Sequence, residues 1–282
     1  MSAPTYPVGR WIINAMIGVS VEVLANAVRV SALAFAGSSS LGNSWPPRAS
    51  GACGPPGRAR RKGREMLGHL YDRALDGERC WIRHQDGELS PLPAHRWSNV
   101  RCPDGSFGDA SDEVFDEAVT RMCTGPTIEL GCGPGRLVAR LIERGVPALG
   151  IDRSATAIRL AGRGGAPALL GDVFEPLPWT GSWQTVLLVD GNVGLGGDPR
   201  RILRRAVELL ARGGRCVAEF DTEAIGIKER WVRLESGRDI GPWFRWASVG
   251  VDSAASLAAQ VGLTLTEVRL IGSRVIAGLA AL

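Results

Sequence analysis

Histidine is scarce in this chain, and the sequence patterns that bind metals are missing. The 282 residues include three histidines (His69, His84 and His95), no HExxH sequence, and six scattered cysteines without a CxxC pair. Zinc sites need closely spaced Cys and His ligands, so we expect no metal centre. The cysteine spacing gives no disulfide framework either, which favours reduced thiols and a cytoplasmic location.

No uninterrupted apolar run is long enough to be a clear membrane span. The best candidate, residues 11–37, is interrupted by polar side chains that include Glu22, Asn26 and Arg29. A charged residue in a lone spanning helix is costly, and Arg10 alone makes a weak start for a secretion signal. Because those three polar residues share one helical face, membrane association of this leader through an amphipathic helix remains an alternative.

A net positive charge is confined to the first 65 residues of the chain. Residues 1–65 hold eight arginines and lysines against two glutamates, a charge of +6. The total of +4 leaves −2 for residues 66–282. A mildly acidic main domain does not favour binding to nucleic-acid phosphates.

A change in composition divides the chain near Met66. Residues 38–65 are dense in Gly, Pro, Ser and Arg, a composition that cannot form a packed core. We therefore interpret residues 1–65 as a poorly structured or helical leader followed by a linker. The sequence alone does not say whether this part belongs to the working protein.

From about residue 66 onward the sequence has the patterns of a folded domain. An Asp-Gly pair within residues 80–92 predicts a hairpin. Beyond Gly125, short apolar segments alternate with helical patterns, and this alternation predicts an α/β fold with a mostly parallel sheet covered on both faces. The expected strands are 127–131, 148–152, 168–172, 185–190 and 215–221, and residues 263–271 and 273–282 should form an antiparallel hairpin turning near Gly272.

The stretch ELGCGPGR places three glycines, Gly131, Gly133 and Gly135, directly after the first of these strands. Glycine lets backbone N–H groups approach a ligand closely, and the helix that follows points its positive end at the same space. Asp152 and Asp172 end the next two strands, where ligands of open α/β sheets bind. A methyl-donor site, a dinucleotide site, and glycines that serve only helix–strand packing all fit this pattern, although Arg136 departs from the GxGxxG dinucleotide fingerprint.

Taken together, TIELGCGPGRL, ALGIDRS, LLGDVF, TVLLVDGNVGLGGDP and LLARGGRCVAEFD resemble a class I S-adenosylmethionine-dependent methyltransferase of the kind seen in actinobacteria. The resemblance covers residues 125–282, and more loosely those from Met66. It implies a Rossmann-like, seven-stranded sheet and S-adenosyl-L-methionine as cofactor. Residues 66–124 would then cap the donor site with helices and a hairpin.

The resemblance also assigns roles along the donor. Glu129 and the three glycines would hold its methionyl part, Asp152 its ribose hydroxyls, and Asp172 with Val173 its adenine. The residues placed beside the methionyl group and the transferring methyl are Asp190, Gly191 and Asn192.

Two departures from the methyltransferase pattern narrow the range of possible methyl acceptors. After the fourth strand the chain reads DGNVGLGG instead of Asn/Asp-Pro-Pro-aromatic, so methylation of nucleobase or glutamine nitrogens loses support. There is also no catalytic Cys motif for base methylation at C5. Because methyl transfer from a sulfonium mainly requires alignment of the reactants, we name no catalytic base, although His95 has suitable chemistry.

The acceptor side is expected in two segments. Residues 222–251 form an insert whose two aromatic runs predict a hairpin that presents Trp231, Trp243, Phe244 and Trp246, either to an acceptor or to the core. Tyr71, His95 and Trp97 are expected to fold over the donor from the N-terminal side. We therefore predict methyl transfer to a small molecule, with a non-catalytic donor-binding module or an NAD-dependent oxidoreductase as alternatives, and no prediction of oligomeric state.

Overall fold

A computed structural model describes residues 68–97 and 110–281 of the chain. The predicted leader, residues 1–65, and its proposed membrane association lie outside the described residues. Within the two described ranges no helix is both long enough and apolar enough to cross a membrane.

The larger of two sheets has seven strands in the order β11-β12-β7-β6-β3-β4-β5. Strands β3 to β7 run parallel to their neighbours, whereas β12 is antiparallel to both β7 and β11. The predicted Rossmann-like fold and its C-terminal hairpin are confirmed. The strands are β3 (Thr127–Leu130), β4 (Ala148–Asp152), β5 (Ala168–Leu170), β6 (Trp183–Leu188), β7 (Leu210–Phe220), β11 (Leu263–Ile271) and β12 (Arg274–Ala281).

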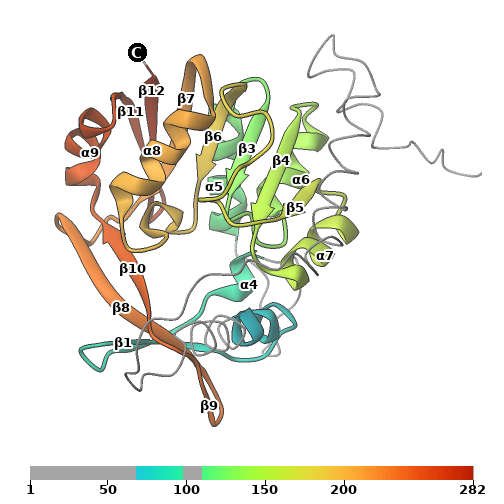
Figure 1. Ribbon diagram of the computed structural model, residues 1–282, viewed down its shortest axis with the longest axis vertical. Coiled ribbons are helices and arrows are strands. Elements are labelled where there is room, and N and C mark those ends of the chain that lie inside the picture. The colour runs from blue at the N-terminus through green and yellow to red at the C-terminus, as the bar shows by residue number, and fades with distance from the viewer. Residues whose placement is uncertain (1–67, 98–109, 282) are drawn as a thin grey trace, which may run out of the picture. The chain divides into compact units, whose positions relative to one another are not determined.

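Helices cover both faces of this sheet, and in Figure 1 α8 lies in front of it and α5 behind it. Helix α6 buries Leu137, Val138 and Leu141, whose helical spacing makes one apolar side. These residues join Phe115 of α5 and Leu187 of β6 in one core cluster. The described helices include 68–75, α4 (Ala94–Trp97), α5 (Ala110–Met122), α6 (Arg136–Glu143), α7 (Ala155–Arg163), α8 (Pro199–Leu209), α9 (Ala254–Gln260) and the 3-10 turns η1 (Asn192–Gly194) and η2 (Val251–Ser253).

The second sheet, which we call the cap sheet, joins segments that are far apart in the sequence. Its order is β10-β8-β1-β2, and β9 pairs with β8. The predicted hairpin supplies two strands, the 222–251 insert supplies the others, and Ile82 lies opposite Leu234 where they pair. The strands are β1 (Trp81–His84), β2 (Leu89–Pro91), β8 (Ile227–Ser236), β9 (Asp239–Ile240) and β10 (Phe244–Val249).

The cap sheet touches the main domain at the loop that follows β6. Leu195 forms an isolated bridge with Trp246 of β10. A Cβ at Gly194 would overlap the carbonyl oxygen of Ala247, so this glycine is needed for the close approach of the two backbones. The loop after β6 and the cap sheet therefore form one packed unit.

Two predicted strands end two residues earlier than expected. β5 stops at Leu170 and β6 at Leu188, so Asp172 and Asp190 lie in the loops that follow these strands. Asp172 turns the chain by accepting a hydrogen bond from the Phe174 N–H. Asp190 has a φ of 57°, which a strand cannot contain.

Candidate functional site

Glu129, the third residue of β3, is a buried acid directly before the glycine loop (Gly131, Gly133 and Gly135). Its side chain interacts with the backbone N–H of Val138 in the first turn of α6. Within the described part of the chain, the other carboxyl oxygen, Oε2, is buried without a hydrogen-bond partner. Burial, followed by the charges of Asp190 and Asp152, raises the pKa of Glu129 well above its usual value. Because buried polar atoms are nearly always paired, this oxygen marks a place for an external donor group.

The three glycines of the loop have different structural roles. All have positive φ values, of 80°, 52° and 79°, which suit glycine. A Cβ at Gly131 would lie 2.8 Å from Nδ2 of Asn192, and one at Gly135 would lie 2.6 Å from Cβ of Ala166. At Gly133 the nearest atom would be the Tyr71 hydroxyl, 3.5 Å away. Gly135 is thus packed closely against Ala166 and α7, whereas Gly133 faces the N-terminal segment.

Asp152 ends β4 beside the same loop. Its Oδ2 accepts a hydrogen bond from the Gly133 N–H at 2.9 Å, and its Oδ1 accepts one from the Ser154 N–H at 2.8 Å. Burial nevertheless raises the pKa of Asp152. Ser154 caps α7 by accepting a hydrogen bond from Ala157 and donates its own hydroxyl to Asp72. Since each carboxylate oxygen accepts more than one hydrogen bond, Asp152 keeps capacity for a ligand's hydroxyl groups.

The loop after β5 is held in place by α8. Arg205 donates to the carbonyl oxygens of Val173 at 2.9 Å and Glu175 at 2.7 Å. Val173 itself is buried, and Asp172 is half-buried at the start of this loop. The carboxylate of Asp172 lies 3.8 Å from the guanidinium of Arg153. The expected adenine-side residues are therefore together in an anchored loop beside Asp152.

The loop after β6 is unusually constrained. The two oxygens of Asp190 bind different arginines, Oδ1 at 2.7 Å from Arg274 and Oδ2 at 2.9 Å from Arg136. The backbone N–H of Asp190 donates to Glu219 at 2.6 Å. Asn192 then donates its side-chain N–H to the carbonyl of Gly131 at 2.9 Å. These bonds hold Asp190 in its left-handed conformation, which costs energy for a residue other than glycine.

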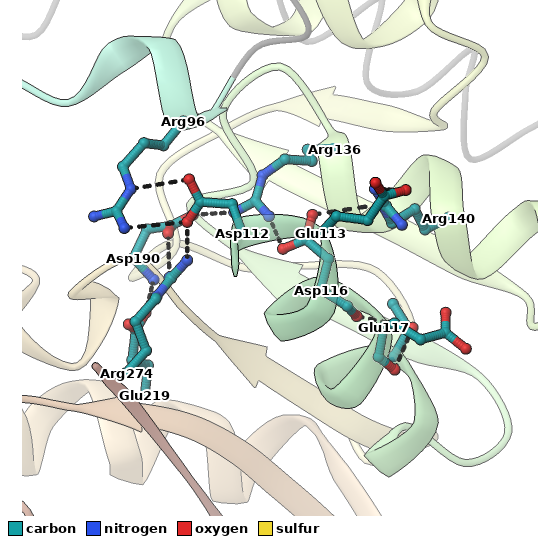
Figure 2. Close-up of polar contacts among 11 residues, drawn as sticks. Arg96, Asp112, Glu113, Asp116, Glu117, Arg136, Arg140, Asp190, Glu219 and Arg274 are labelled. Carbon is teal, nitrogen blue, oxygen red and sulfur yellow. Dashed lines mark hydrogen bonds and ion pairs between the residues drawn. The ribbon is translucent and has the colours of Figure 1, made fainter. Parts of the chain in front are cut away.

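Arg274, the first residue of β12, is the centre of this ionic cluster (Figure 2). It binds both oxygens of Glu219 at 2.7 and 2.8 Å, and it also binds Asp190 and Asp112. Its guanidinium lies 3.6 Å from the ring centroid of Phe115. The contacts with Glu219 and Asp190 raise the pKa of Arg274 against the effect of burial. One cation thus joins β7, the loop after β6, and α5.

The sequence analysis missed Arg274, Glu219 and the positioning contacts of Arg136. Arg136 was noted only as a departure from the dinucleotide fingerprint, yet it binds Asp116 and Asp190 at once. Glu219 is the only acid within the otherwise apolar end of β7, VAEF. A carboxylate at that position of a buried strand is a signal that sequence reasoning could have used.

The N-terminal segment reaches the site through Tyr71. Its ring lies 5.8 Å from that of Trp97, and its hydroxyl is near Gly133. Burial and the charge of Asp152 raise the pKa of Tyr71. His95, on the short helix α4, is half-buried, and none of the described contacts links it to the glycine loop.

Trp246, one of the aromatic residues proposed for the acceptor side, lines a pocket. This pocket is bounded by the loop after β6, the end of β7, β10 and the start of β12. Trp231 and Trp243, which are exposed by 49% and 42%, do not line this pocket. No group of three or more His, Cys, Asp or Glu residues suited to a metal occurs in the described ranges.

Residues 128–218 match the family model described as a methyltransferase domain. The chain therefore carries a methyltransferase domain, and its fold is that of class I S-adenosylmethionine-dependent methyltransferases. The match runs from β3 to β7 and includes the glycine loop, Asp152, Asp172 and Asp190, and so contains all the residues predicted to bind the donor.

Solved structures agree with this methyltransferase fold. A SAM-dependent methyltransferase from Bacteroides fragilis, solved with S-adenosyl-L-homocysteine, is 18% identical, covers 77% of this chain and 95% of its own, and has a TM-score of 0.60. A protein from Pyrococcus horikoshii is 14% identical, covers 68% and 99%, and has a TM-score of 0.52. No curated protein sequence matches the chain.

The site of the methyltransferase fits the donor of its class. The unpartnered oxygen of Glu129 suits an ammonium group. Asp152 has free acceptor capacity for ribose hydroxyls, and the first turn of α6 directs its N–H groups at the loop. The donor set therefore agrees with S-adenosyl-L-methionine as the cofactor.

Proposed function

We propose that this enzyme transfers the methyl group of S-adenosylmethionine to a small-molecule acceptor. The donor would lie along the edge of the main sheet that runs from the glycine loop to Asp190. The observation that carries the proposal is the buried Glu129 oxygen without a partner, placed where the donor's ammonium group would be expected.

Each predicted donor residue has a role that its surroundings support. Glu129 would accept a hydrogen bond from the donor's ammonium group. Gly131 and Gly133 would let the backbone approach the methionyl group. Asp152 would accept the ribose hydroxyls while it holds Gly133 in place. The residues expected on the adenine side are Asp172 and Val173, in the loop that Arg205 anchors.

The Asp190 loop would position the methyl group and would not itself take a proton. The carboxylate of Asp190 is occupied by two arginines, so it is ill suited to act as a base. Its bonds instead fix Gly191 and Asn192, and Asn192 connects this loop to Gly131. We infer that the loop sets the distance between the donor and the acceptor pocket.

The donor supplies a sulfonium methyl group with a good leaving group, so the enzyme's task is alignment and exclusion of water. Tyr71 and Trp97 would cover the donor from the N-terminal side, since their rings lie side by side and the Tyr71 hydroxyl is near Gly133. The cap sheet would cover the acceptor through its contact with Gly194. No separate catalytic base is assigned.

A small-molecule acceptor is favoured over a macromolecule by size and charge. The pocket next to Asp190 has a volume of about 240 Å³, below the roughly 300–1,000 Å³ of sites for drug-sized ligands. Residues 66–282 carry a charge of −2, which does not favour nucleic-acid phosphates. These two properties support a small-molecule acceptor.

The direct test is transfer of a labelled methyl group from S-adenosylmethionine to a metabolite extract of the source organism, with Asp152→Ala as the control. We expect labelled small-molecule products, and a loss of donor affinity in the variant of about 1–3 kcal/mol. Unchanged donor affinity in Asp152→Ala would remove that residue from the site.

The same experiments separate the alternatives. Calorimetric binding of S-adenosylmethionine without any labelled product would favour a non-catalytic binding module. Saturable binding of NAD(H) with no affinity for S-adenosylmethionine would favour an oxidoreductase and contradict the proposed function.

A further inference from the structure

The pocket beside Asp190 is lined by different residues from the donor edge, by which we mean the edge of the main sheet from the glycine loop to Asp190. It is lined by Glu219 near the end of β7, by Asp221 directly after that strand, and by Arg274 at the start of β12. Gly191 of the Asp190 loop and Trp246 of β10 in the cap sheet also line it. A ligand in this pocket would therefore lie directly beside the loop proposed to position the methyl group.

The charges of this pocket do not cancel. Arg274 binds three carboxylates, from Glu219, Asp190 and Asp112. These carboxylates neutralise its positive charge within the ionic cluster. Asp221 is not part of that cluster. Its Oδ1 accepts the backbone N–H groups of Glu223 and Ala224 at 2.8 and 3.0 Å. Among the described residues, neither oxygen of Asp221 has a cationic partner, so the pocket has an exposed carboxylate that a ligand can reach.

The aromatic wall of the pocket, Trp246, also favours a positively charged ligand. A Cβ at Gly191 would lie 3.5 Å from Cζ2 of Trp246, so the indole packs directly over the loop. Trp246 is half-buried and is fixed by its bridge with Leu195. An indole face attracts cations through its quadrupole. An indole and an unpaired carboxylate on one pocket together favour a positively charged or N–H-donating group.

We propose that the acceptor is an amine, methylated on nitrogen, and that Asp221 and Trp246 bind its amino group. This inference rests on the proposed function, because it assigns the chemical class of the acceptor for that same reaction. A phenol, a thiol or a carboxylate would bring no positive charge to the pocket, and an ionised acceptor of that kind would be repelled by Asp221.

Methylation of an amine conserves protons and electrons. The bound ammonium first loses one proton to water, which frees the lone pair of nitrogen. That lone pair forms the new N–C bond while the S–C bond breaks and its electrons remain on sulfur, so the sulfonium becomes a neutral thioether. The positive charge moves to nitrogen. Asp221 accepts a hydrogen bond from a remaining N–H group and so stabilises this charge. The product then leaves as an ammonium or after loss of a proton to water.

The first test is binding, without turnover, to the full chain saturated with S-adenosylhomocysteine. Benzylamine and benzyl alcohol have nearly the same shape, and only the amine is a cation at neutral pH. Ligand-observed NMR should give benzylamine an affinity about tenfold or more above that of the alcohol. Asp221→Asn should abolish the difference, because the Asn carbonyl can still accept the Glu223 and Ala224 N–H groups but carries no charge. Glu223→Gln, an exposed acid nearby, is the matched control and should preserve it.

Equal affinities of the two probes in the unchanged protein, or a preference that survives in Asp221→Asn, would overturn the proposal. The second test locates the label in the products of the transfer assay. Methyl groups on nitrogen, with transfer reduced about ten- to 100-fold in Asp221→Asn at unchanged donor affinity, support it. Labels found only on oxygen, sulfur or carbon contradict it while leaving methyl transfer itself intact. Failure of S-adenosylhomocysteine to bind would instead contradict the proposed function.

Discussion

The proposed donor edge and the proposed acceptor side of this enzyme are built in different ways. The donor edge comes from consecutive strand–loop–helix units, so Glu129, the glycine loop, Asp152 and Asp172 follow one another within a short part of the sequence. The acceptor side brings together the loop after β6, the ends of β7 and β12, and β10 of the cap sheet. Substitutions on the donor edge should therefore act locally on cofactor binding, whereas those on the acceptor side should also disturb the packing of distant segments.

The largest effect is expected at Arg274, which holds the acceptor side together. Arg274→Met would leave Glu219, Asp190 and Asp112 without their shared cation, and should lower the free energy of unfolding by about 3–5 kcal/mol. The control is the exposed Arg269, which pairs with Glu267 of the same strand, β11. Arg269→Met should lower the free energy of unfolding by less than about 1 kcal/mol. Similar values for the two variants in chemical denaturation would contradict the central position of Arg274.

The contact between the cap sheet and the β6 loop should be the next most sensitive point. Gly194→Ala adds a methyl group that overlaps the Ala247 carbonyl, so we expect a loss of about 1–3 kcal/mol in the free energy of unfolding. Gly162 lies within α7 with no atom near its missing Cβ, and Gly162→Ala should stabilise by up to about 1 kcal/mol. Opposite signs in the two denaturation curves are the predicted result. A tolerated Gly194→Ala would mean that β10 does not pack closely on this loop.

Glu129 should make stability depend on pH in a characteristic direction. Because its pKa is raised in the folded protein, folding retains a proton that the unfolded chain loses above its ordinary pKa. Its contribution is present at low pH and is lost as pH rises toward the raised value, with a slope of at most about 1.4 kcal/mol per pH unit. Glu129→Gln should remove this slope and stabilise the donor-free protein at neutral pH. The measurement is the free energy of unfolding at several pH values, with the exposed Glu223→Gln as a control that keeps the slope.

The smallest effect is expected at Tyr71, where the N-terminal segment meets the donor edge. Tyr71→Phe removes only the hydroxyl near Gly133, so donor affinity should fall by about 0.5–1.5 kcal/mol. Tyr71→Ala also removes the ring packed against Trp97 and should lower the free energy of unfolding as well. Calorimetry and denaturation on both variants distinguish the two contributions. Unchanged donor affinity in both would exclude Tyr71 from the donor site.

The sequence predicted the donor edge better than the acceptor side. Parallel strands carry short apolar runs and their loops carry glycine or aspartate, so β3, β4 and Asp152 were predicted with their positions. The cap sheet depends on pairing β1 with β8, and no local pattern in either segment encodes that partner. Arg274 and Glu219 are likewise ordinary charged residues in sequence, and their importance appears only when β7 and β12 lie side by side.

The most direct test is a calorimetric titration of S-adenosylhomocysteine into three proteins at neutral pH: the unchanged chain, Glu129→Gln and Asp221→Asn. We predict that the unchanged chain binds, that Glu129→Gln loses about 1.5–3 kcal/mol of binding free energy with its charged hydrogen bond, and that Asp221→Asn binds as the unchanged chain does. An absence of binding to the unchanged chain, or equal affinity in Glu129→Gln, would contradict the assignment of the donor edge.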